Sequence, residues 1–171
     1  MVPSTRVYAF ICGRHTIPKE RFIAGAAGRI TFPVPSYVIV HPEATVVFDS
    51  GFSRCVHSDL AGYYPARELE AVEFHFAPED ELIAQLTKIG VDPDSIELVI
   101  NSHLHYDHCG GNIQFPQATV MVQRAEYEAA MVAPEDSGGY RKIDFTTEQA
   151  FHFLDGEHDV FGDGSLVLLP T

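Results

Sequence analysis

The sequence predicts an α+β fold in a single domain, residues 1–171, with helices and a mixed, largely antiparallel sheet. Runs of β-branched and aromatic residues bounded by Gly and Pro predict short strands. Apolar residues spaced three and four apart predict a helix between two of these strands. Hydrophobic residues make up 46% and charged residues 20% of the chain, as in globular proteins. No repeat, low-complexity tract or linker divides it.

The first predicted elements are strands. Arg6–Cys12 is rich in β-branched and aromatic residues and is closed by Gly13. Residues 14–35 carry three prolines and two glycines, which predicts a long loop. Long loops in compact domains are often functional. The runs Tyr37–Val40 and Thr45–Phe48, separated by four residues, predict a β-hairpin.

The middle of the chain contains the clearest helix. Residues 52–78 have no clear periodicity, so we assign no element there. Pro78 then opens a helix with acidic residues in its first turn, where the helix dipole favours them. Its apolar face comprises Leu82, Ile83, Leu86 and Ile89. Gly90 ends this helix, and Ile96–Ile100 follows as a strand of the buried type.

Four elements are predicted after residue 115. Ala118–Gln123 has the character of a strand, and Arg124–Met131 that of a helix. Phe151–Leu154 and Ser165–Leu169 resemble a pair of strands around a turn-rich insert. The helix–strand alternation from Pro78 onward is half of a βαβ pattern.

Charge and cysteine content restrict the partners and the compartment. Lys and Arg total 11 against 24 Asp and Glu, a formal net charge of -13, which disfavours nucleic acid and anionic membranes. A small neutral substrate and a site with bound cations fit this charge better, and a homodimer stays open. Three cysteines without CxxC spacing indicate a reducing compartment. With no signal-peptide or membrane-spanning run of apolar residues, we expect a cytoplasmic protein.

Four residues with metal-binding side chains directly follow the strand Ile96–Ile100. They are His103, His105, Asp107 and His108. Two residues apart in an extended segment, His103 and His105 point the same way, and a following bend can direct the other two toward a second point. Imidazole and carboxylate together suit zinc, and also manganese, iron or cobalt. A single histidine at a strand end is usually an ordinary polar residue, but this density favours a metal site.

Other candidate ligands are weaker. His152 lies in an apolar strand and His158 in an acidic turn, so we expect neither to bind metal, and the same holds for the neighbouring Asp155 and Asp159. Four further histidines lack ligand spacing: His15, His41, His57 and His75. We expect Cys109 to be a small buried thiol that packs beneath the site.

The segment His103–His108, which reads His-Leu-His-Tyr-Asp-His, resembles the HxHxDH motif of the metallo-β-lactamase superfamily. Residues 99–112 resemble its N-acyl-homoserine lactonase-like branch most closely. The triplet Asp49–Gly51 resembles the superfamily's earlier Asp-Thr-Gly motif, with Ser50 in place of Thr. The order of elements is similar too. The resemblance implies an αββα sandwich, of which this chain covers the N-terminal αβ half.

The resemblance also implies two divalent metal ions, zinc above all. His103 and His105 would bind the first, and Asp107 and His108 the second. A hydroxide bridging the metals would be the nucleophile, and Asp107 would also act catalytically by passing a proton to the leaving alkoxide. Asp49 would lie behind the ligands and orient a ligating histidine. The alternative for Asp49 is a turn cap before glycine.

The implied function is metal-dependent hydrolysis of lactone rings such as those of acyl-homoserine lactones, the quorum-quenching reaction. The alternatives are a β-lactamase, a thioesterase of the glyoxalase II type, a phosphodiesterase and an inactive half-domain. The family's third His, bridging Asp and last His would lie beyond Thr171. We therefore expect a C-terminally truncated domain that alone binds metal weakly and has little activity. We also expect the truncation to leave the strands Ile96–Ile100 and Leu166–Leu169 partly uncovered. Aromatic candidates for an acyl-chain site are Phe22, Phe32, Tyr63, Tyr64, Phe74 and Phe76.

Overall fold

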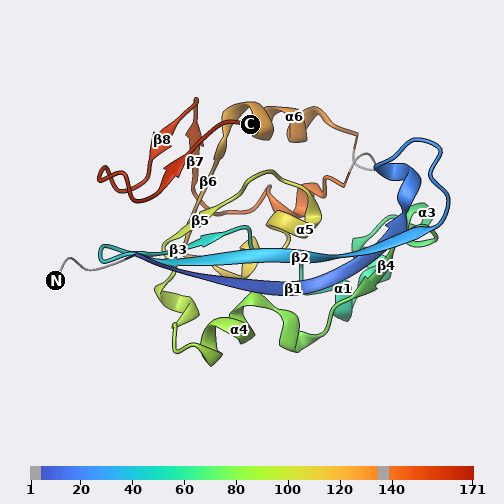
Figure 1. Cartoon of the computed structure of the whole chain (residues 1–171), viewed down its shortest axis with the longest axis horizontal. Coiled ribbons are helices and arrows are strands. Elements are labelled where there is room, and N and C mark those ends of the chain that lie inside the picture. The colour runs from blue at the N-terminus through green and yellow to red at the C-terminus, as the bar shows by residue number, and fades with distance from the viewer. Residues whose placement is uncertain (1–4, 135–138) are drawn as a thin grey trace.

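The computed structural model describes residues 5–134 and 139–171 and contains a seven-stranded mixed sheet in the order β4-β1-β2-β3-β5-β6-β7 (Figure 1). The strands are β1 (Arg6–Pro18), β2 (Arg29–Val40), β3 (Thr45–Phe48), β4 (Glu73–His75), β5 (Leu98–Ile100), β6 (Thr119–Gln123) and β7 (Phe151–Leu154). A separate hairpin pairs β8 (His158–Asp159) with β9 (Val167–Leu168). The sheet is antiparallel from β4 to β3 and parallel from β3 to β7, which confirms the predicted mixed sheet.

The helices are short. They are α1 (Cys55–Ser58), α2 (Leu60–Tyr63), α3 (Ala66–Leu69), α4 (Leu82–Lys88), α5 (Tyr106–Cys109) and α6 (Arg124–Val132). Five 3-10 helices accompany them in the described ranges: Lys19–Arg21, Pro78–Asp80, Pro93–Ser95, Asn112–Gln114 and Lys142–Asp144. None of the helices in the described residues is long and apolar enough to cross a membrane.

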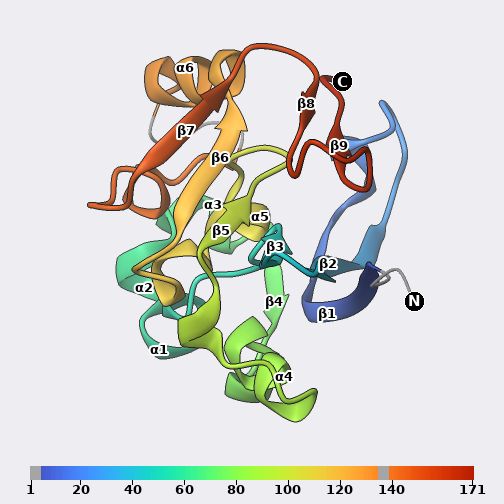
Figure 2. The ribbon, with the colours of Figure 1, turned by 90° about the vertical axis from the view of Figure 1, so that its left-hand side faces the viewer.

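Alternation along the strands separates two faces of the sheet. The helix α4 lies on one side of β1 and β2 (Figure 2). Val38, Val47 and Val99 form a buried cluster with Leu82 and Leu86 of α4. Their chain neighbours point to the other face, where Ile39, Val46 and Ile100 form a second cluster with Leu168 of β9. The buried Val122 packs against Ala130 of α6, so the central strands are apolar on both faces.

The face opposite α4 is only partly covered. Val7 is 63%, Val167 39% and Leu169 63% exposed, which confirms that Leu166–Leu169 is partly uncovered. The same expectation is wrong for Ile96–Ile100, because Val99 and Ile100 are fully buried between β3 and β6.

The prediction of a long loop over residues 14–35 is wrong. Most of it is strand: β1 continues to Pro18, and β2 begins at Arg29 and pairs with β1 in a long antiparallel hairpin. Pro33 and Pro35 are tolerated in β2 because β2 pairs with β3 only from Tyr37 onward, so the earlier residues of β2 need no N–H on that side. Pro18 is the last residue of β1. The β2–β3 hairpin over Tyr37–Val40 and Thr45–Phe48 is confirmed.

Two further regions differ from the prediction. Phe151–Leu154 does not pair with Ser165–Leu169; β7 instead adds in parallel to β6, and β9 pairs with β8. Residues 52–78, left unassigned from sequence, fold into α1, α2, α3 and the edge strand β4. The predicted helix with Leu82, Ile83 and Leu86 is confirmed, but it begins at Leu82 and not at Pro78, because Pro78–Asp80 form a separate 3-10 turn. Gly90 follows its C-terminal end at a φ of 76°.

Candidate metal centre

The four sequence-predicted ligands come together where β5 ends. His103 and His105 lie on the extended segment after the strand, and Asp107 and His108 lie in α5. The ring centroid of His103 is 4.6 Å from that of His105 and 3.9 Å from that of His108. An Asp107 carboxylate oxygen lies 3.6 Å from Nε2 of His108. Three imidazoles and a carboxylate are thus grouped at the carboxyl end of β5.

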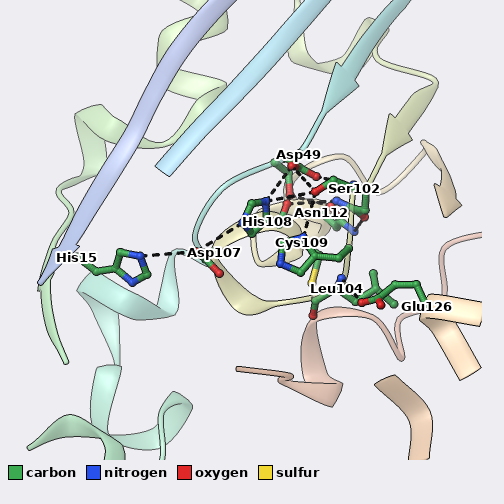
Figure 3. A network of polar contacts seen from close by, with 12 residues as sticks. His15, Asp49, Ser102, Leu104, Asp107, His108, Cys109, Asn112 and Glu126 are labelled. Atoms are coloured by element: carbon green, nitrogen blue, oxygen red, sulfur yellow. Dashed lines mark hydrogen bonds and ion pairs between the residues drawn. The ribbon is translucent and has the colours of Figure 1, made fainter. Parts of the chain in front are cut away.

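Asp49 lies directly behind this group (Figure 3). It is 4% exposed and accepts three hydrogen bonds of 2.8 Å, from His108 Nδ1–H and from the backbone N–H and hydroxyl of Ser102. The Ser102 oxygen in turn lies 3.1 Å from Nδ1 of His103. In both histidines Nδ1 therefore has a hydrogen-bond partner behind the group, and the lone pair of Nε2 stays available for a metal ion.

The loop after α5 is held close to the end of β3. Ser50 N–H donates to the carbonyl of His108 at 2.7 Å, and a chain of side-chain bonds links Ser50, Asn112 and Asn101. A Cβ on Gly111 would overlap the carbonyl of Ser50. Gly110 and Gly111 are adjacent to α5 at φ values of -59° and -82°, so it is close backbone approach that requires glycine there.

A second set of contacts holds the segment between His103 and His105. A carboxylate oxygen of Glu126, in the first turn of α6, accepts the backbone N–H of Leu104 at 2.8 Å. Its other oxygen accepts the hydroxyl of Tyr140, whose ring centroid is 4.7 Å from that of His105. Cys109 is fully buried and donates to the Leu104 carbonyl, so it packs beneath the site as expected.

The electrostatics of the histidines differ with their partners. Burial, together with the neighbouring imidazoles, lowers the pKa of His103, and burial lowers the pKa of His105. Burial also opposes protonation of His108, but its hydrogen bond to Asp49 and the charge of Asp107 raise its pKa above the ordinary value. The rings of His103 and His105 are therefore neutral near pH 7 and can donate a lone pair to a metal ion. A bound cation would displace any proton held by His108.

The group opens onto a pocket of about 560 Å³. Of the six aromatic candidates, Phe22, Phe32 and Tyr64 line it. The other three do not: Phe74 and Phe76 pack against Phe52, and Tyr63 donates to the buried Asp144. The lining also includes Arg21, Glu68, Tyr140 and Arg141. It includes His15 as well, which no motif or spacing in the sequence singles out.

The weaker candidates have other partners. His41 stacks on Phe161, His57 bonds to Glu81, and His75 bonds to Thr16. His152 and His158 lie on β7 and β8 and do not line the pocket. Asp155 pairs with Arg124, and Asp159 accepts backbone N–H groups of its own turn.

The donors fit a transition-metal pair, although their number per ion is small. Two orienting hydrogen bonds leave Nε2 of His103 and of His108 available, and Asp107 faces the latter. Imidazole and carboxylate are zinc ligands. In residues 5–134 and 139–171, however, no three His, Cys, Asp or Glu side chains meet at a single metal position. The arrangement thus groups candidate ligands in pairs, with hydrogen-bond partners behind them.

Comparison with known proteins agrees with this geometry. The family model described as metallo-beta-lactamase superfamily matches residues 29–171. The chain belongs to the metallo-β-lactamase superfamily. Its mixed sheet with helices is the corresponding half of that fold. A solved structure of an N-acyl homoserine lactone hydrolase, with N-hexanoyl-L-homoserine bound at the catalytic metal center, superposes with a TM-score of 0.79 at 25% identity, covering 94% of this chain and 63% of that one.

Curated relatives within the superfamily include two lactonases. N-acyl homoserine lactonase AttM of Azorhizobium caulinodans is 34% identical over 163 residues, 91% of this chain and 60% of that protein. N-acyl homoserine lactonase of Bacillus thuringiensis is 28% identical over 142 residues, 82% of this chain and 55% of that protein. The chain therefore spans somewhat over half the length of the relatives it matches.

Proposed function

We propose that this chain forms the metal-binding part of a hydrolase that opens lactone rings, with N-acyl-homoserine lactones as the substrate class. The observation that carries the proposal is the grouping of His103, His105, Asp107 and His108 at one end of a pocket with aromatic walls. The names of the similar proteins support the choice of substrate, because they describe lactone hydrolysis at a metal centre.

Each residue of the group has a proposed role. His103 and His105 hold one divalent ion, and Asp107 and His108 the other, with zinc as the expected metal. Two such ions lower the pKa of a bound water toward about 7 and supply a nucleophile at neutral pH. Asp49 fixes the tautomer and direction of His108. Asp107 stands at the pocket surface, where it can pass a proton to the leaving alkoxide.

The pocket suits an acyl lactone better than a polyanion. Its walls combine aromatic and aliphatic groups, among them Phe22, Phe32 and Ile17, that can cover a hydrocarbon chain. The net charge of -13 disfavours phosphodiesters of nucleic acid.

The test is a substrate panel in the presence of Zn²⁺, Mn²⁺ or Co²⁺. It contains an N-hexanoyl-homoserine lactone, a penicillin, a glutathione thioester and a phosphodiester, given to the wild type, to H108A and to H158A. We expect the wild type to bind metal, and any turnover to be confined to the lactone and lost in H108A. H158A is the matched control, since His158 lies outside the pocket.

Each other outcome assigns a different function. Preferential turnover of the penicillin, thioester or phosphodiester would replace the lactonase proposal with the corresponding hydrolase. Bound metal without turnover of any substrate would favour the inactive half-domain. Equal metal content in wild type and H108A would contradict the proposed ligand set.

A further inference from the structure

His15 is a buried polar residue in the wall of the pocket. It lies on β1, is 3% exposed and is surrounded by aromatic rings. Its ring centroid lies 4.1 Å from that of Phe32, 5.7 Å from that of Phe52 and 6.0 Å from that of Tyr106. A histidine in such a place costs free energy unless both ring nitrogens are satisfied.

The two nitrogens of His15 face different partners. Nδ1 lies 3.0 Å from the hydroxyl of Tyr106, within hydrogen-bonding distance. Nε2 is buried, makes no hydrogen bond in the described part of the chain, and lies 3.6 Å from a carboxylate oxygen of Asp107 (Figure 3). An ionised carboxylate has only acceptors, so the nitrogen that faces it must carry the proton. Nδ1 of the neutral ring then accepts the hydroxyl of Tyr106.

We propose that His15 is a positioning residue for Asp107, holding its carboxylate toward the metal pair through Nε2–H. The proposal rests on the metal-binding role of Asp107 proposed above. At 3.6 Å the N–H lies just beyond hydrogen-bonding distance and acts on the carboxylate as a nearby dipole. Polar groups placed behind a ligating carboxylate or imidazole fix its direction toward the metal.

The support for His15 continues away from the metal group. Tyr106 is 6% exposed, and its ring packs edge-on against that of Tyr64, another residue of the pocket lining, with 5.0 Å between the ring centroids. Tyr106, His15 and Asp107 thus form a line of polar contacts through otherwise aromatic surroundings. This line complements the contact of Asp49 with His108 on the other side of the Asp107–His108 pair.

The alternative role for His15 is that of a direct ligand. Its Nε2 is as far from Asp107 as is Nε2 of His108, 3.6 Å in both cases. The structure favours positioning, because no three such side chains in the described ranges meet at one metal position. The two roles differ in what can replace histidine: a glutamine keeps an N–H donor but is a poor zinc ligand.

The first measurement reads the His15 tautomer by long-range ¹H–¹⁵N correlation on the metal-free, ¹⁵N-labelled chain. We expect the Nε2–H form. The Nδ1–H form in the wild type would overturn the proposal. This readout needs neither metal nor turnover, so it stays informative if the proposed hydrolase function fails.

The second measurement is Co²⁺ binding, followed by visible absorption, in the wild type, H15F, H15Q and H75F. H15F keeps an aromatic ring without the N–H. We expect H15F to lower the affinity for the second Co²⁺ by roughly 10–100-fold, with little change in the affinity for the first. We expect H15Q to bind the second Co²⁺ almost as tightly as the wild type does. H75F removes a histidine of the neighbouring strand outside the pocket and should bind like the wild type.

Three results would count against the proposal or its basis. H15F that folds, as judged by circular dichroism, and binds Co²⁺ like H75F would overturn it. Loss of the second Co²⁺ in both H15F and H15Q would make His15 a ligand instead. A wild type that binds fewer than two Co²⁺ would contradict the proposed two-metal site, while the tautomer still decides the placement of His15.

Discussion

Two groups of residues hold the proposed metal ligands and their pocket by different means. The first, which we call the hydrogen-bonded wall, lies behind the pocket-lining His108 and comprises His108, Asn101, Ser102, Asn112 and Asp49, linked by polar contacts of 2.7–3.1 Å. The aromatic wall comprises His15, Phe32, Phe52, Tyr64 and Tyr106, whose neighbouring ring centroids lie about 4–6 Å apart. The first fixes direction, as metal ligands require, whereas the second fixes shape, as an apolar substrate requires.

Breaking the hydrogen-bonded wall at Asp49 should have the largest effect. D49A removes the acceptor of three part-buried donors, so each donor left alone should cost about 1 kcal/mol, the lower end of the range for buried groups. Asp49 also has a φ of 57°, which Ala tolerates less well than Asn or Asp. We expect a loss of roughly 5 kcal/mol in the free energy of unfolding, measured by urea titration.

D49N and D59A sharpen that test. D49N keeps one acceptor and the tolerated backbone conformation, so its loss should be about half. Asp59 only caps α2 at an exposed position, and D59A should cost about 1 kcal/mol. A D49A loss no greater than that of D59A would mean that packing, not the hydrogen bonds, holds this wall.

The second effect concerns a carboxyl group buried behind the aromatic wall. Burial raises the pKa of Asp144 from 3.8 to about 7, although the hydroxyl of Tyr63, at 2.5 Å, opposes this. The folded state therefore holds the proton more tightly than the unfolded state. The stabilisation is complete below pH 3.8 and is lost as the pH rises to about 7, a change of at most about 4 kcal/mol.

D144N cannot ionise and keeps an acceptor for Tyr63. Relative to the wild type, its free energy of unfolding should therefore rise between pH 4 and pH 8 and level off above. Y63F removes the hydrogen bond that favours the ionised carboxylate, so its free energy of unfolding should fall more with rising pH than that of the wild type. A D144N difference that is flat with pH would show that Asp144 ionises normally in the folded chain.

The two walls also differ in how far the sequence predicts them. The proposed metal ligands in front of the hydrogen-bonded wall lie within six residues, and Asp49 follows a recognisable strand, so local patterns locate both. The aromatic wall joins residues far apart: His15 and Tyr106 are separated by 91 positions. Prolines and glycines in residues 14–35 predict a loop, whereas pairing with β1 extends β2 back through Pro35 and Pro33 to Arg29. Long-range pairing of this kind leaves no local signal.

A substitution at Glu126 tests whether α6 also helps to fix the direction of the proposed ligands, as the hydrogen-bonded wall does. Its carboxylate accepts the N–H of the fully buried Leu104, between two proposed ligands. E126A leaves that N–H alone, which should cost about 2 kcal/mol and weaken Zn²⁺ binding roughly tenfold. E126Q keeps an oxygen acceptor and should lose less than half as much.

The matched control is E128A, because Glu128 is exposed on the same helix. Unfolding curves and competition with a zinc chelator measure the two quantities. If E126A lowers stability without weakening Zn²⁺ binding, α6 supports the fold of the segment and not the direction of its histidines.

The smallest expected effect is on the aromatic wall, where shape is shared among many rings. Phe32 lines the pocket and contacts both Phe22 and His15. F32A should weaken binding of N-decanoyl-homoserine by roughly fivefold, about 1 kcal/mol, and of N-butanoyl-homoserine by less, because only the longer chain reaches the lost surface. Calorimetry with the Zn²⁺-loaded chain measures both.

Phe74 offers the comparison, since it packs against Phe52 in the same aromatic cluster without lining the pocket. F74A should lower stability while leaving the preference for chain length unchanged. If F32A lowers the affinity for both acyl-homoserines equally, Phe32 supports His15 and does not contact the acyl chain. Weaker support of Asp107 through His15 would affect every ligand alike. The aromatic wall would then fix direction as well as shape, and the division between the two walls would fail at this residue.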